Sequence, residues 1–174
     1  MLAPQLPGYH IAPMVPADAL AWAEYALLPE VTRFTSSSAQ SAADIVPMIA
    51  RTLAADPNAP VLFAVRDGAG RFVASVGFHT VSALNRSAEV TYTVHPAHWG
   101  QGLATQLCDA AVRWGFAQRG WVRIQATTLE EHAASQRVLL KCGFALEGRL
   151  RNFRIVRGTP RDYLLYARIP EAER

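Results

Sequence analysis

The sequence is poor in cysteine and has no long apolar run. Cys108 and Cys142 are its only cysteines, and neither belongs to a Cys-x-x-Cys pair, which argues against a zinc site or a redox pair. No uninterrupted apolar stretch reaches the roughly 18 residues that cross a bilayer, so we expect no membrane partner. Residues 1–7 lack the basic start and apolar centre of a signal peptide, which predicts a cytoplasmic protein.

Internal repeats and low-complexity segments are also absent, and the length of 174 residues suits one domain. We expect a single domain over residues 1–174, with residues 1–8 as a loose tail. The net charge of +3 is small, but five arginines crowd one late segment: Arg149, Arg151, Arg154, Arg157 and Arg161. Without interleaved aromatic residues such a cluster favours a solvated surface, and RNA or ribosome binding through it remains an alternative.

Hydrophobic periodicity and turn residues predict a chain that begins with one strand and two helices. A helix capped by Asp18 and stopped by Pro29 follows the first strand, and a second helix ends near Asp56-Pro57. Three antiparallel strands then precede a long helix, a fifth strand that pairs in parallel, a short helix and a closing hairpin. The predicted strands cover residues 9–14, 61–66, 72–80, 87–94, 122–127, 144–155 and 162–169, and the helices 18–28, 42–54, 102–119 and 132–141.

The stretch from Val94 to Thr105 reads as the end of a strand, a glycine turn and the start of a helix. Gly100 and Gly102 leave the backbone open to a ligand, and the first turn of a helix offers unpaired N–H groups to an anion. A phosphate or pyrophosphate is the guest that this pattern favours, although a turn that merely starts a helix has the same two glycines. A Rossmann site would need a longer G-x-G-x-x-G, and a Walker loop would need Gly-Lys-Ser/Thr; neither is present.

Several motifs in one order resemble the GCN5-related N-acetyltransferase (GNAT) superfamily, and within it the RimJ/RimL-like branch that acetylates ribosomal protein N-termini. The similarity covers almost the whole chain. The motifs are the strand Ala88-Glu89-Val90-Thr91-Tyr92, the loop Trp99-Gly100-Gln101-Gly102-Leu103-Ala104-Thr105, the helix start His132-Ala133-Ala134-Ser135, the helix end Lys141-Cys142-Gly143-Phe144, and Gly148-Arg149 with Asp162-Tyr163-Leu164-Leu165-Tyr166 in the last hairpin.

The resemblance implies an α+β fold of three layers, with a mixed, mostly antiparallel sheet of seven strands and about four helices. A central parallel pair would splay apart, and acetyl-CoA would bind there as co-substrate, its pantetheine arm along the strand that ends at Val94. No metal is expected. The residues implied in cofactor binding are Val94, His95, Trp99, Gly100, Gln101, Gly102, Leu103, Ala104, Thr105, His132 and Ser135.

Direct attack of an amine on the thioester needs a base for the amine and a proton for the CoA sulfur. By resemblance Ser135 supplies that proton, because it occupies the position that serves in this branch. Many other members of the superfamily use a tyrosine further along the helix, at the place of Leu139 here. A hydroxyl that only caps the helix or contacts the cofactor is the alternative. Glu89 is our candidate base, directly or through water, against a surface carboxylate paired with an arginine such as Arg86. His95, His98 and His132 flank the site and offer alternative bases.

This sequence departs from the family pattern at His132, where asparagine is usual, at Trp99, often Gln or Arg, and at Pro96, an acid in some relatives. The missing tyrosine and His132 motivate an alternative function, a catalytically weak regulatory module that binds CoA. For an enzyme, the acceptor is a protein N-terminus or a small amine, and the loops at residues 29–41 and 157–161 would shape its pocket. Relatives that form homodimers make a homodimer possible here.

Overall fold

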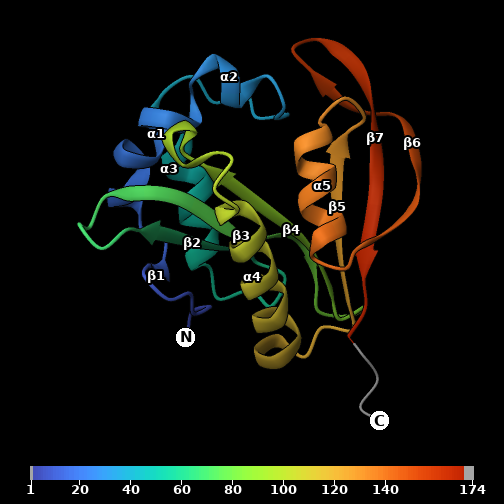
Figure 1. Ribbon diagram of the computed structural model, residues 1–174, viewed down its shortest axis with the longest axis horizontal. Helices are drawn as coiled ribbons and strands as arrows, with labels where there is room; N and C mark the ends of the chain where they lie inside the picture. The colour runs from blue at the N-terminus through green and yellow to red at the C-terminus, as the bar shows by residue number, and fades with distance from the viewer. Residues whose placement is uncertain (1, 171–174) are drawn as a thin grey trace.

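The structure, a computed structural model, describes residues 2–170 (Figure 1). One mixed sheet runs through it in the order β1-β2-β3-β4-β5-β7-β6. The strands are β1 His10–Pro13, β2 Val61–Arg66, β3 Phe72–Ser82, β4 Ser87–Val94, β5 Arg123–Leu129, β6 Ala145–Val156 and β7 Thr159–Arg168. The helices are α1 Ala19–Ala26, α2 Pro29–Thr32, α3 Ala42–Ala50, α4 Leu103–Arg119 and α5 Ala133–Lys141. Within residues 2–170, none of these helices has the length and apolar character that a membrane span requires.

The centre of the sheet is a parallel pair that separates along its length. β4 and β5 are paired only from Ser87 to Glu89, opposite Arg123 to Gln125, while the other neighbouring strands are antiparallel. Beyond Glu89 the two strands diverge, so β4 has an unpaired edge in the middle of the sheet. The expected fold of seven strands with a splayed parallel pair is thus confirmed, and α2 is a short addition to the four expected helices.

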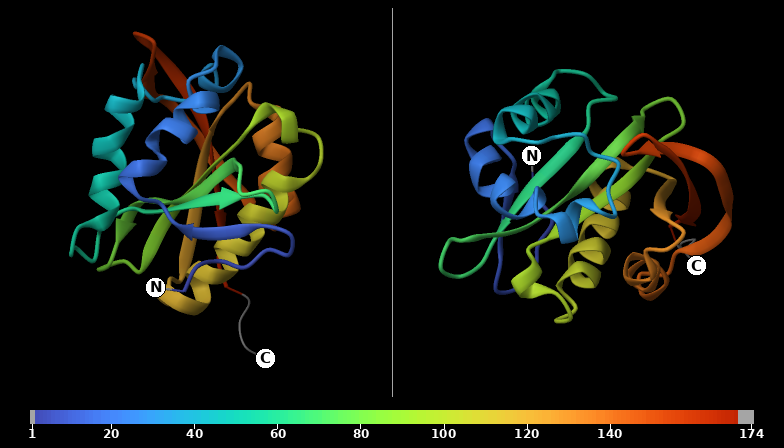
Figure 2. Two further views of the ribbon diagram at one scale, coloured as in Figure 1. Left: turned by 90° about the vertical axis from the view of Figure 1, so that its left-hand side faces the viewer. Right: turned by 90° about the horizontal axis from the view of Figure 1, so that it is seen from above.

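Helices cover both faces of the sheet, as Figure 2 shows. On one face α1 and α3 pack over Ala64 and Met14, and on the other α4 and α5 pack over the main core. Successive side chains of a strand point to opposite faces, so Phe63 and Val65 join the α4 side while Ala64 joins the α1 side. We call these the α1 face and the α4 face.

The N-terminal segment differs from the expected loose tail. The indole N–H of Trp114 in α4 donates to the Leu2 carbonyl at 2.6 Å, and Ala3 and Leu6 pack against the core. The ring of Trp114 in turn meets Phe63 edge to face. The segment is therefore attached to the core at Ala3 and Leu6 and through the Leu2 carbonyl, although the Leu2 side chain is exposed, and a sequence of prolines and glycine does not reveal these contacts.

Some helices and strands begin or end a few residues away from the predicted positions, because tertiary contacts determine those ends. Asp18 stands at the N-cap position of α1, yet its carboxylate makes no capping bond to that helix; it accepts from the Val15 N–H and pairs with Arg66 of β2. Pro29 does not only stop a helix, because it occupies the first turn of α2. The first helix ends at Ala26, α3 ends at Ala50 before a 3-10 turn, and β5 continues to Leu129.

Candidate functional site

The glycine turn opens α4 in the manner of an anion site. Gly100 and Gly102 have φ angles of +75° and +80°, a backbone conformation that residues with a Cβ atom rarely adopt. The Gln106 N–H donates to the Gly102 carbonyl at 3.1 Å, so the helix amides that precede Gln106 have no acceptor within the helix. These amides and the positive end of the α4 dipole suit a phosphate group.

The unpaired edge of β4 runs from this turn to the gap where β4 and β5 diverge, which we call the splay. The His95 N–H donates to Val73 of β3, and alternation along the strand then turns the peptide groups of Tyr92 and Val94 away from β3. The Val94 carbonyl already accepts from the Trp99 indole N–H at 2.8 Å. The free N–H groups at Tyr92 and Val94 therefore face the space that β5 has left.

A pair of hydroxyl groups lies on the α4 face of the splay. Tyr92 and Ser135 approach to 2.9 Å between their oxygens, and Tyr92 also donates to the Ser135 carbonyl at 3.4 Å. Burial raises the pKa of Tyr92 above its usual range, so its hydroxyl keeps its proton. Ser135, in the first turn of α5, thus faces the end of β4 with a buried partner that fixes its position.

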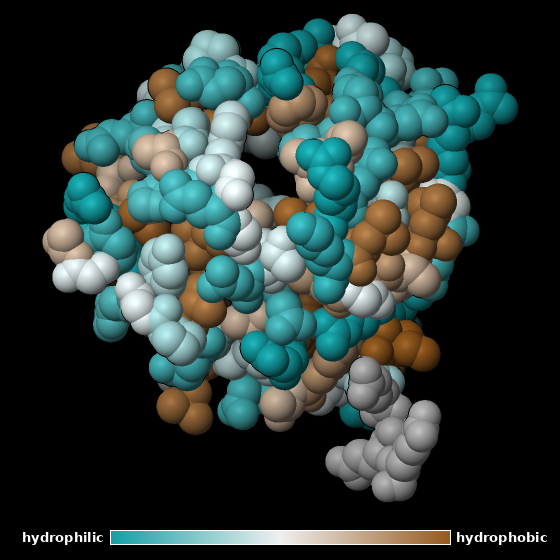
Figure 3. Space-filling view, viewed as in Figure 1, coloured by the Kyte–Doolittle hydropathy of each residue, from teal (hydrophilic) through white to brown (hydrophobic). Residues whose placement is uncertain are grey.

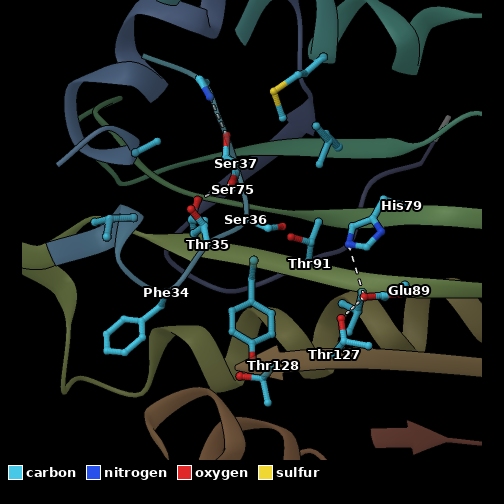
Figure 4. Close-up of a pocket in the computed structure, with 18 of the residues that line it drawn as sticks. Phe34, Thr35, Ser36, Ser37, Ser75, His79, Glu89, Thr91, Thr127 and Thr128 are labelled. Carbon is cyan, nitrogen blue, oxygen red and sulfur yellow. Dashed lines mark hydrogen bonds and ion pairs between the residues drawn. The ribbon is translucent and has the colours of Figure 1, made fainter. Parts of the chain in front are cut away.

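Glu89 lies on the α1 face and is 3% exposed. Its Oε1 accepts from Thr127 Oγ1 at 2.6 Å and from Arg154 Nη2 at 3.0 Å, and its Oε2 accepts from Gln125 Nε2 at 3.4 Å. The His79 ring nitrogen Nε2 is 3.8 Å from Oε1, and burial lowers the pKa of His79, while Glu89 opposes that shift. Figure 4 shows Glu89 between His79 and Thr127.

A cavity of about 650 Å³ connects these groups. Glu89 and Thr127 line it from the α1 face, and Tyr92 and Ser135 from the α4 face, so it passes through the sheet where β4 and β5 diverge. In Figure 3 the surface is hollowed below α2. Among residues 2–170, two buried side-chain oxygens have no hydrogen-bond partner, Thr128 Oγ1 and the Tyr163 hydroxyl, and both residues line this cavity.

Residues 34–39 form a strap across the cavity. Phe34 stacks on the His132 ring with 4.0 Å between centroids and 3° between planes, and the Arg33 guanidinium lies 4.3 Å from the Phe34 centroid. The strap is thereby joined to the first turn of α5. A second recess of about 480 Å³ lies between residues 36–40 and the tip of the last hairpin, at Arg157 and Gly158.

The stacking of His132 on Phe34 leads us to expect that the fold loses stability in acid. Burial, and secondly the Arg33 charge, lower the pKa of His132 to about 4. Because the unfolded chain has a histidine pKa near 6.5, protonation favours unfolding, and this penalty grows as the pH falls from about 6.5 to about 4. Above pH 6.5 it vanishes. His132→Phe keeps a ring on Phe34 but does not titrate, so it should lose less stability than the wild type between pH 7 and pH 5.

Urea denaturation at the two pH values measures this difference. His10→Phe, on the exposed part of the edge strand β1, is the matched control and should keep the wild-type response. Equal losses in His132→Phe and the wild type would assign the acid sensitivity to other groups.

The structure brings some of the predicted residues together and separates others. Ser135, Glu89 and His132 line the cavity, whereas His95 and His98 do not: His95 accepts the Ala97 N–H and lies 5.4 Å from the Tyr25 ring. The glycine turn lies outside the cavity, at the far end of β4. Glu89 is paired with an arginine, as the alternative to a base expected, but the partner is Arg154 and the carboxylate is buried; Arg86 instead donates to the Gly120 carbonyl.

The sequence reasoning missed Arg154, Tyr163, His79 and the hydroxyl of Tyr92 as site groups. Arg154 stood only in a charge cluster, which the structure shows to be largely paired: Arg149 with Glu130 and Asp162, Arg154 with Glu89, and Arg161 with Glu131. Tyr92 and Tyr163 had been quoted within motifs, and strand alternation alone would have placed Tyr92 opposite to Glu89. No cluster of three metal-ligating side chains occurs in the described part of the chain.

A family model described as "Acetyltransferase (GNAT) domain" matches residues 10–145. The uncharacterized N-acetyltransferase YoaA of Bacillus subtilis (strain 168) is 37% identical over 101 residues, which are 58% of this chain and 57% of that protein. The chain thus matches little more than half the length of this relative.

Two solved structures show the same fold. The ribosomal-protein-S5-alanine acetyltransferase from Vibrio fischeri has a TM-score of 0.85 and 17% identity, covering 97% of this chain and 96% of that one. The spermidine N-acetyltransferase from Vibrio cholerae, in complex with CoA and spermine, has a TM-score of 0.82 and 17% identity, covering 93% and 95% of the two chains.

Proposed function

Since the chain belongs to the GNAT acetyltransferase family, we propose that it transfers an acetyl group from acetyl-CoA to a primary amine, either a protein N-terminus or a small amine. The observation that carries this proposal is the cavity through the splayed sheet, with hydroxyls on one face and a carboxylate on the other. The two related enzymes whose folds match act, by their names, on a ribosomal protein and on spermidine. They therefore leave the acceptor class open.

The α4 face has the features that a CoA arm requires. A Cβ at Gly100 or Gly102 would be strained, and the free amides of the turn suit the pyrophosphate. The N–H groups of Tyr92 and Val94 suit the amide oxygens of pantetheine, as in the addition of a strand to an open edge. Trp99 holds the Val94 carbonyl, which leaves the Val94 N–H as the group free to bind. When bound, acetyl-CoA supplies a thioester carbonyl for attack by an amine.

Ser135 is the group that we assign to protonation of the leaving sulfur. Its oxygen lies 2.9 Å from the Tyr92 oxygen, and the raised pKa of Tyr92 keeps a proton in this pair at neutral pH. Leu139, at the place of the more usual tyrosine, is 1% exposed and has no proton to give. The Tyr92–Ser135 pair thus replaces the missing phenol with one contributed by β4.

Glu89 is the group that we assign to accepting the proton of the amine, directly or through water. It lies on the opposite face of the sheet from Ser135, so the amine enters from the α1 face beneath the strap. Thr127, Gln125 and Arg154 each donate to its carboxylate and orient it toward the cavity. The two proton transfers therefore use separate groups.

A regulatory module that binds CoA without turnover is the second candidate, and Leu139 and His132 motivate it. His132, stacked on Phe34, is assigned here to holding the strap rather than to the cofactor. The arginine cluster does not favour RNA binding, because most of its charges are paired within the chain. A homodimer and a cytoplasmic location stay predictions.

The variant Ser135→Ala tests whether Ser135 protonates the leaving sulfur. If Ser135 is the acid, we expect kcat to fall by about 100-fold with little change in the Kd for CoA. Release of CoA thiol with a panel of amines gives kcat, and calorimetry gives Kd. Ser41→Ala, in the exposed cap of α3, is the matched control and should keep wild-type values. CoA binding by the wild type without thiol release on any amine would instead establish the regulatory module.

A further inference from the structure

The Tyr163 hydroxyl is a buried group that the proposed chemistry does not use. Tyr163 pairs with Leu129 across β7 and β5, which places its side chain on the same face as Thr127 and Glu89. It is 4% exposed and lines the cavity, and its hydroxyl has no hydrogen-bond partner within residues 2–170. Burial raises its pKa, although Arg154 and the nearby Ser36 oppose the shift, so the hydroxyl remains a neutral donor. A buried hydroxyl without a partner in the protein is unfavourable unless a ligand or an ordered water completes its hydrogen bonding.

Arg154 contacts both the Tyr163 ring and the Glu89 carboxylate. Its guanidinium lies 5.6 Å from the centroid of the Tyr163 ring, and its Nη2 donates to Glu89 and, at 3.3 Å, to Thr127. Its Nη1 reaches Ser36 of the strap at 3.4 Å. A guanidinium has five N–H donors, more than these contacts use. Next to Glu89 there is therefore a cluster of donors suited to an oxygen atom.

The charged groups that line the cavity cancel one another. Its lining contains two carboxylates, Asp44 and Glu89, and two guanidinium groups, Arg51 and Arg154. Glu89 is already paired with Arg154, and Asp44 is bound to the cap of α3. Because their pKa values are lowered, His79 and His132 are neutral at pH 7 and leave this balance unchanged. The further ammonium groups of a polyamine would thus gain no net electrostatic attraction from the lining.

We infer that Arg154 and Tyr163 form a specificity subsite for a carbonyl-type oxygen on the carbon next to the reacting amine. The acceptor is then an α-amino carbonyl compound, and a polyamine is a poor substrate. A free amino acid and a peptide N-terminus both carry this oxygen. The inference rests on the proposed acetyl transfer and specifies its acceptor.

The test measures kcat and KM by thiol release, with the full chain, for four acceptors: alaninamide, alanine, isopropylamine and spermidine. Isopropylamine has the amine and methyl group of alaninamide without its carbonyl. Tyr163→Phe removes only the hydroxyl, and we expect it to lower kcat/KM for alaninamide about tenfold through KM, with isopropylamine changed less than about twofold. Tyr166→Phe, on the same strand but outside the cavity lining, should change neither. Ratios of variant to wild type cancel the different basicities of the amines.

Arg154→Gln gives a second, independent result. We expect it to raise the ratio of kcat/KM for spermidine to that for alaninamide by about tenfold, because a positive charge leaves the cavity. Alaninamide preferred over alanine would identify a peptide N-terminus as the source of the oxygen, and the reverse a free amino acid. Equal losses on alaninamide and isopropylamine in Tyr163→Phe, or a wild-type preference for spermidine, would overturn the subsite while acetyl transfer stands. Absence of thiol release with every amine would overturn both.

Discussion

Gly102→Glu is expected to weaken CoA binding by about 100-fold or more. Gly102 has a φ of +80°, so a side chain there strains the turn, and a carboxylate would stand at the positive end of the 17-residue helix α4. The negative charge would then occupy the place that the pyrophosphate needs. Calorimetric titration with CoA measures the loss, and thermal unfolding of the variant shows whether the fold is kept.

Gly102→Gln is the matched control, since it has the same length and the same backbone strain without the charge. It should bind CoA more weakly than the wild type and more tightly than Gly102→Glu. Wild-type affinity in Gly102→Glu would remove the turn from the cofactor site. Equal affinities of the two variants would attribute the effect to the backbone alone.

Glu89→Gln is expected to lower kcat by about 100-fold or more, because an amide cannot accept the proton of the amine. The substitution preserves the shape of the side chain, and its amide oxygen can still accept from Thr127, whereas its amide nitrogen cannot accept from Gln125 Nε2, so that weaker bond is lost. Arg154 loses its anionic partner, so the Kd for CoA, which binds on the other face, is the measurement that separates catalysis from general damage. We expect that Kd to be unchanged.

Glu147→Gln is the control for this variant. Glu147 forms an exposed ion pair with Arg123 at 2.6 Å and does not line the cavity, so its loss should leave kcat within about twofold. If Glu89→Gln retains activity at that level, the base is another group. His79, with its ring nitrogen 3.8 Å from Glu89, would then be the group to replace.

Local patterns were sufficient for the elements that carry the cofactor side. The predicted ranges 61–66 and 87–94 coincide with β2 and β4, because alternating side chains and strong turn residues define both ends of each strand. The glycine turn and the start of α4 follow from residues adjacent in the chain. The prediction was wrong where tertiary contacts determine the end of an element. Asp18, for example, pairs with Arg66, which is 48 residues away.

The acceptor side depends on contacts between distant segments. Arg154 reaches Glu89 across 65 residues, and it does so after a register shift in β6 between Leu150 and Arg154. No periodicity in the sequence predicts a bulge of this kind, so a neighbouring arginine, Arg86, was the natural but wrong partner. The stack of Phe34 on His132 likewise joins segments that have no shared pattern.

Where β4 and β5 diverge, the two faces of the sheet carry groups suited to different substrates. The groups suited to CoA come from β4, α4 and α5, whereas those suited to the acceptor come from the strap and the last hairpin. Mutations in the strap or hairpin can therefore accumulate without disturbing the glycine turn, which we propose as the pyrophosphate site. Such a separation makes acceptor preference readily evolvable: one scaffold can move between proteins, amino acids and small amines while its donor remains the same.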